Sequence, residues 1–148
     1  MGQSTSIFLA FVGGVFLAMH AGFNTQLNVQ LKSPIVTLLA VYIASTLFVF
    51  LVLSIVNPSF PSFGQLKEVP FYLWFSGALF SVAGIALYYH TIPKLGISTM
   101  VSIGLFGQII FSVVAGHFGW FGLPVEPVAS KKLIGIVAMT LGIILIKN

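Results

Sequence analysis

Charged side chains are so rare in this sequence that long stretches of the chain contain none. No Asp, Glu, Lys or Arg precedes Lys32, and the next charged residue is Lys67. A segment of about 20 uncharged, mostly apolar residues can cross the ~30 Å hydrocarbon core of a bilayer as a helix. Charged residues make up 5% of the 148 residues and hydrophobic residues 58%, whereas soluble domains are about 25% charged. The chain is therefore expected to be an integral membrane protein.

The composition also excludes several classes of function. The net charge of +4 comes from six lysines scattered along the chain, so no basic surface for nucleic acid is expected. The sequence has no cysteine, no aspartate and no His-Glu-x-x-His motif, which removes thiolate metal sites, Ser-His-Asp triads and this zinc motif. Glu68 and Glu126 both fall in predicted loops. We expect a protein that is not an enzyme and that holds neither a metal ion nor a cofactor.

The uncharged stretches predict an all-α protein with five transmembrane helices in a single domain, residues 1–148. Ser33 can cap the second helix, because a serine before Pro34 suits a helix start. Turn-rich residues 57–69 predict a loop, and the aromatic and glycine-rich residues 118–130 predict a segment at the membrane interface. The last span has only 14 uninterrupted apolar residues, so its flanking lysines would have to snorkel. We expect the spans at about residues 5–27, 34–56, 70–90, 95–117 and 130–147.

Polar side chains within the predicted spans are the candidates for a substrate path, because they are costly in lipid unless they face protein or water. Gln108 lies at the centre of its span, with Ser112 one turn further along. His20, Asn24 and Asn28 follow one side of the first helix. The structural alternatives are an interhelical hydrogen bond for Gln108, worth about 1 kcal/mol, and an ordinary interfacial helix end for residues 24–30. The expected substrate-binding residues are His20, Asn24, Asn28, Tyr42, Ser81, Tyr88, Gln108 and Ser112.

Small residues recur along three of the predicted helices, and such stripes let helices approach closely in membranes. For the stripes of the first span (Ala10, Gly14, Ala18 and Gly22) and of the third (Gly77, Ser81 and Gly84), packing within the chain is the expected role. The last span is terminal in the sequence and can reach a partner. We therefore expect a dimer interface there, formed by Gly135, Met139 and Gly142.

Several of these residues together resemble a known family. They are Met19-His20-Ala21-Gly22-Phe23-Asn24, Ser33-Pro34, Pro93-Lys94-Leu95-Gly96, Gly107-Gln108 and His117-Phe118-Gly119-Trp120-Phe121-Gly122-Leu123-Pro124. This combination resembles the YdcZ (DUF606) branch of the drug/metabolite transporter superfamily. The resemblance implies one half of an EamA-type transporter, related to the small multidrug resistance proteins that work as antiparallel dimers. It also implies the bacterial cytoplasmic (inner) membrane. His20 and Gly116 depart from the pattern, which has Gln and Asp at these places.

The expected function is that of a secondary transporter, an exporter or exchanger working by alternating access. The neutral Asn, Gln, Ser and His side chains suit a small polar or zwitterionic metabolite better than a metal ion. The expected partners are this small molecule, the lipid bilayer and a second copy in an antiparallel homodimer, or a paralogous subunit. With five spans, three lysines fall on each side of the membrane, which favours insertion in both orientations. The alternative is a non-transporting membrane scaffold or accessory subunit.

Overall fold

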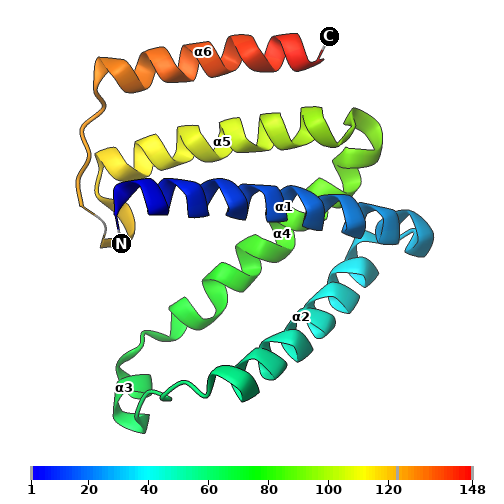
Figure 1. The fold of residues 1–148 in the computed structure, drawn as a ribbon, viewed down its shortest axis with the longest axis vertical. Coiled ribbons are helices and arrows are strands. Elements are labelled where there is room, and N and C mark those ends of the chain that lie inside the picture. The colour runs from blue at the N-terminus through cyan, green and yellow to red at the C-terminus, as the bar shows by residue number, and fades with distance from the viewer. Residues whose placement is uncertain (1, 123, 148) are drawn as a thin grey trace. The chain divides into compact units, whose positions relative to one another are not determined.

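The computed structural model describes residues 2–122 and 124–147, and the regular elements in these ranges are all helical. Four of them, α1, α2, α4 and α5, are long and apolar enough to cross a membrane. The predicted class, an all-α membrane protein, is confirmed. The crossing of α6 stays a prediction. In order, the elements are α1 (Gln3–Leu31), α2 (Pro34–Val56), α3 (Phe63–Glu68), α4 (Phe71–Leu95), α5 (Ile97–His117), the 3-10 turn η1 (Trp120–Gly122) and α6 (Ser130–Lys147) (Figure 1).

The chain divides into two compact units, Met1–Pro93 and Lys94–Asn148. In the first unit α1 packs against α2, and in the second α5 packs against α6 and η1. The boundary between the units falls near the end of α4, next to the proline that this helix contains. The single membrane domain predicted from the sequence stays a prediction.

A tight turn joins α1 to α2. Lys32 adopts a left-handed conformation (φ 54°) and its N–H donates to the carbonyl of Asn28, which ends α1. Ser33 then caps α2, its hydroxyl accepting from the N–H of Val36 at 3.4 Å, with Pro34 in the first turn. The predicted cap is therefore confirmed. The turn brings the polar end of α1 beside the start of α2.

Two regions differ from the sequence prediction. The 57–69 loop contains the short helix α3, which begins with a reciprocal cap between Ser62 and Gln65. The third long helix was expected to end near residue 90, but α4 continues through Pro93 to Leu95, and Gly96 (φ 78°) makes the turn that follows. A proline in a helix removes one backbone donor, so α4 needs a substitute near its end.

The glycines of the small-residue stripes have open space around them. A Cβ atom added at Gly14, Gly77 or Gly84 would meet no other atom within 4 Å. Among the described residues, no neighbouring helix therefore lies against these three glycines, although Ser81 in the stripe of the third span contacts Tyr42 at 2.6 Å. A Cβ atom added at Gly135 or Gly142 on α6 would also lie in open space. These are the two glycines predicted to contact a second protomer.

Candidate functional site

Several buried residues of the first unit are polar. Thr25 and Asn28 near the end of α1, Thr37 near the start of α2, and Tyr89 near the end of α4 are all buried. We call these four residues the junction, because they lie where the three helices come together. Buried polar groups are costly in lipid unless they are hydrogen-bonded, so the partners of each one indicate its role.

The side chain of Asn28 supplies a hydrogen-bond donor that the backbone of α4 lacks. In a regular helix the carbonyl of Tyr89 would accept from the N–H four residues later, but that residue is Pro93, which has no N–H. The side-chain amide of Asn28 donates to this carbonyl at 2.9 Å. Transmembrane helices tolerate proline where a neighbouring helix supplies such a replacement donor. Asn28 therefore fastens the end of α4 to α1.

Thr37 connects the same asparagine to α2. Its hydroxyl lies 3.4 Å from the Oδ1 atom of Asn28 and 2.9 Å from the carbonyl of Ser33. Thr25 is satisfied within α1, where its hydroxyl donates to the carbonyl of Ala21 at 2.7 Å. Both polar ends of the Asn28 amide are thus engaged by protein, one by α4 and the other by α2.

The hydroxyl of Tyr89 is the exception in the junction. This side chain is 1% exposed, and among the described residues its hydroxyl has no hydrogen-bond partner of proper geometry. Asn24, which is half-buried, and Tyr42 are the polar side chains that interact with it. A buried hydroxyl of this kind calls for an additional polar partner. The junction therefore retains unused hydrogen-bonding capacity on the side of Asn24 and Tyr42.

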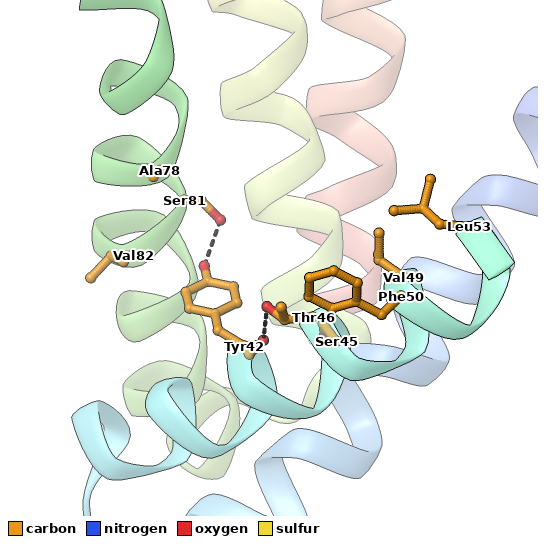
Figure 2. Close-up of a pocket in the computed structure, with 9 residues that line it drawn as sticks. All are labelled: Tyr42, Ser45, Thr46, Val49, Phe50, Leu53, Ala78, Ser81 and Val82. Carbon is orange, nitrogen blue, oxygen red and sulfur yellow. Dashed lines mark hydrogen bonds between the residues drawn. The ribbon is translucent and has the colours of Figure 1, made fainter. Parts of the chain in front are cut away.

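A cleft lies between α2 and α4, beyond the junction. Its volume is about 520 Å³, within the range of about 300–1,000 Å³ typical of small-molecule sites. Figure 2 shows Tyr42 reaching from α2 to the hydroxyl of Ser81 on α4, with an O–O distance of 2.6 Å. The lining residues are Tyr42, Ser45, Thr46, Val49, Phe50, Leu53, Ala78, Ser81 and Val82.

The cleft is positioned well inside the span of α2. Tyr42 lies eight residues after Pro34 and Leu53 nineteen residues after it, which corresponds to about 12 Å and about 28 Å along the helix axis. The polar lining is uncharged: two hydroxyls at Tyr42 and Ser81, and further hydroxyls at Ser45 and Thr46. Thr46 donates to the carbonyl of Tyr42 at 2.8 Å, so its proton is used within α2. The cleft combines a hydroxyl cluster with apolar walls at membrane depth.

The structure brings together only part of the predicted substrate-binding set. Asn28 belongs to the junction, Tyr42 and Ser81 line the cleft, and Asn24 and Tyr88 are half-buried on α1 and α4 without belonging to either. His20 is exposed on α1. None of these placements by itself assigns a substrate contact.

The remaining predicted residues lie in the second unit. Gln108 and Ser112 are exposed on α5, where the Ser112 hydroxyl donates to the carbonyl of Gln108 at 2.7 Å. On α6, Met139 is half-buried. Lipid is a poor environment for an exposed amide, so Gln108 is expected to face another protein surface or water in the working protein.

Sequence reasoning missed Tyr89 and Thr37 in the junction, and Thr46 and Phe50 in the cleft. A signal for the first pair was present, because a proline inside an apolar stretch leaves the carbonyl four residues earlier without a donor. Asn28 is one of the few amide side chains on a neighbouring helix that could replace it. No comparable signal exists for Phe50, since the pairing of α2 with α4 is a tertiary property.

The segment after α5 is aromatic and outside the long helices. The Phe111 ring lies 6.0 Å from that of Trp120, and Phe118 stacks on Trp120 at the same distance. Further along, Lys132 donates to Glu126 at 2.7 Å. This hydrogen bond and the lysine charge hold the pKa of the Glu126 carboxyl below its ordinary value.

Gly116, one of the two positions where the resemblance implies a different residue, lies against this segment. Its carbonyl accepts from the N–H of Glu126 at 2.8 Å, and a Cβ atom at 116 would lie 3.8 Å from the Cβ atom of Glu126. That is ordinary contact, so space alone does not require glycine. An aspartate at this position would, however, place a second carboxylate beside Glu126, and like charges at such a distance repel.

Four helices of this length and hydropathy define a multi-pass membrane protein. Residues 5–145 match the family model DMT_YdcZ, described as "Putative inner membrane exporter, YdcZ". Because the match spans nearly the whole chain, the chain belongs to the YdcZ family, and the family resemblance and inner-membrane location predicted from the sequence are confirmed. No curated protein and no solved structure matches the chain.

Proposed function

We propose that this protein is a secondary exporter that binds a small molecule in the cleft between α2 and α4 and moves it by alternating access. The observation that carries the proposal is the cleft itself, with uncharged hydroxyls at a depth where lipid offers no hydrogen bonds. Binding sites of secondary transporters tend to lie near the bilayer midplane. Membership in a family described as "Putative inner membrane exporter" supports the outward direction proposed here.

The junction gives this proposal a mechanical basis. α2 and α4 are tied to α1 at one end through Asn28, while further along their side chains border the cleft. A tie at one end and a space at the other allow the two helices to separate or close about the junction. Pro93 contributes because a helix with a missing hydrogen bond bends more readily at that point.

We propose further that the working unit is an antiparallel homodimer. Gln108 and Ser112 on α5, and separately His20 on α1, are exposed in the single chain, and a second protomer can cover each of these polar surfaces. The open surface of α6 at Gly135 and Gly142, next to Met139, offers a place for close helix contact. The equal division of lysines favours two opposite insertions, and inverted pairs are the arrangement that alternating-access transporters use.

Labelling of single cysteines in intact cells tests the antiparallel arrangement. Cysteines introduced at Ser62, before α3, and at Lys94, near the end of α4, are predicted to lie on opposite sides of the membrane. Dual insertion predicts that an impermeant thiol reagent reaches each site in about half of the molecules. Complete labelling at one site and complete protection at the other would mean one orientation, and would rule out the antiparallel dimer.

The function itself is tested by flux. Purified protein in sealed proteoliposomes is loaded with a broad panel of small metabolites, and efflux is compared with empty liposomes. The proposal predicts saturable efflux of at least one compound. Absence of flux for the whole panel, from protein that is folded and dimeric, would favour the rival function of a scaffold or accessory subunit.

A further inference from the structure

We infer that the cleft between α2 and α4 selects uncharged amphiphilic molecules, which have an apolar or aromatic body and a hydrogen-bonding amide or hydroxyl head. The inference rests on the proposed function and narrows it, because the sequence alone suggested polar or zwitterionic metabolites equally. It concerns the chemistry of one site and not the direction or the energy source of transport.

The first argument for an uncharged ligand is that the lining of the cleft carries no charge. None of the nine lining residues is ionised at neutral pH. A zwitterion would bring two charges into a site at membrane depth with no countercharge among these nine residues, and burying an unpaired charge is far more costly than burying a neutral polar group. A permanent cation is disfavoured for the same reason.

The second argument is that the polar and apolar side chains occupy different parts of the cleft, which suits an amphiphilic ligand. The polar groups gather where Tyr42 meets Ser81, with Thr46 one turn from Tyr42. Val49, Phe50 and Leu53 continue along α2 as an apolar wall, and Val82 adds to it from α4. A ligand that matches this lining has its polar head at one end and its apolar body along α2.

The hydrogen-bonding capacity of the hydroxyl pair defines the head. Each hydroxyl has one donor and two acceptor positions, and the 2.6 Å bond between Tyr42 and Ser81 uses one donor and one acceptor. One donor and several acceptors remain for a ligand. An amide or hydroxyl, which both donates and accepts, fits this remainder, whereas a carboxylate accepts only.

The two hydroxyls can be removed with little change in shape. Tyr42→Phe combined with Ser81→Ala removes both while the ring and the Cβ atoms remain. Tyr72→Phe combined with Ser54→Ala is the matched control, since it makes the same chemical change on the same two helices outside the cleft. Tyr72 is 66% exposed, and Ser54 donates to the carbonyl of Phe50 within α2.

The test measures equilibrium binding of three radiolabelled probes to the purified full-length protein in lipid nanodiscs. At about pH 6, N-acetylphenylalaninamide is neutral, phenylalanine is a zwitterion and phenylalaninamide is mostly a cation, and all three have the same aromatic body. We expect the neutral probe to bind at least roughly 10-fold more tightly than either charged probe. The cleft variant should weaken it roughly 3- to 10-fold, and the control variant should leave it unchanged.

Three results would overturn the inference. They are equal or tighter binding of the zwitterion or cation, unchanged affinity of the neutral probe in the cleft variant, and no saturable binding of any probe, as expected if lipid fills the cleft. The flux panel separates this failure from failure of the proposed function. Efflux of charged metabolites without neutral binding would leave an exporter with a different selectivity, whereas no efflux at all would remove both.

Discussion

The cleft is formed by α2 and α4 and the junction by the same two helices together with α1, yet the polar groups of the two regions are used in different ways. In the junction Asn28 and Thr37 are buried and engaged by protein, one of them replacing a donor that Pro93 lacks. In the cleft Tyr42 and Ser81 are only half-buried, and their hydroxyls bond to each other beside about 520 Å³ of space. Polar residues in a span can thus satisfy a backbone or remain available to a ligand.

The comparison explains why polarity alone is a poor guide to a binding site in a membrane protein. Asn28 is deeply placed and polar, which made it a candidate for substrate binding, but its amide donates to the carbonyl of Tyr89. Tyr42 carries a weaker polar signal, yet its hydroxyl borders open space. The Asn28 amide replaces a missing backbone donor in a buried place, whereas the Tyr42 hydroxyl bonds to Ser81 and still borders open space.

The largest effect is expected at Gln108, which tests whether the polar path extends beyond the first unit. Gln108→Leu removes the amide from α5 and should lower transport at least roughly 10-fold while folding is retained, because a transport path loses a hydrogen-bonding group in low dielectric. Efflux from proteoliposomes measures the effect. Gln108→Asn, which keeps the amide, should retain part of the activity. Wild-type efflux from Gln108→Leu would leave this residue as a packing contact.

A substitution at Asn28 tests whether the polar groups of the junction stabilise the fold. Asn28→Leu leaves the carbonyl of Tyr89 without its donor and should lower the free energy of unfolding by about 1–2 kcal/mol. Thermal unfolding in mild detergent measures the change. Pro93→Ala restores a backbone N–H to α4. In a Pro93→Ala protein, Asn28→Leu should therefore lower the free energy of unfolding clearly less than in the wild type. The same cost in both backgrounds would show that the amide does not compensate for the proline.

The smallest effect is expected at the exposed pair formed by Glu126, which precedes α6, and Lys132, near the start of α6. Its stabilisation is present above the ordinary pKa of a glutamate, about 4.3, and is lost as the pH falls through the lowered pKa of Glu126. Because such exposed pairs contribute little, Glu126→Gln should change the melting temperature by no more than about 1 °C at pH 7. This difference should vanish once the pH lies well below the lowered pKa of Glu126. A difference that grew toward acid pH would contradict the lowered pKa.

Much of the architecture was predictable because it follows from local chemistry. The long uncharged stretches predicted the membrane helices, and Ser33 with Pro34 predicted the start of α2. The capping pair of α3 was also visible as Ser62 and Gln65, but the neighbouring prolines and Gly64 made the segment read as a loop. The sequence likewise predicts a turn at Pro93, because proline is disfavoured in the interior of a helix. The helix continues through Pro93 because the Asn28 side chain of α1 supplies the missing hydrogen-bond donor.

The site was less predictable because it depends on which helices are neighbours. Tyr42 and Ser81 are 39 residues apart, and nothing in either helix alone indicates their pairing. The buried hydroxyl of Tyr89 was likewise invisible, since Tyr88 and Tyr89 are adjacent aromatics in the sequence. The structure buries Tyr89 and leaves Tyr88 half-buried, whereas sequence reasoning selected Tyr88.

Filling the cleft is the most direct test of the account, because it does not depend on the chemistry of the substrate. Ala78 lines the cleft, whereas the next residue on α4, Leu79, does not and is 67% exposed. For any compound that the wild-type protein exports from proteoliposomes, Ala78→Trp should reduce efflux at least roughly 10-fold by occupying the site, since a ligand cannot enter filled space. Leu79→Trp should leave efflux unchanged. Equal efflux from the wild type and both variants would contradict the central claim that the substrate binds between α2 and α4.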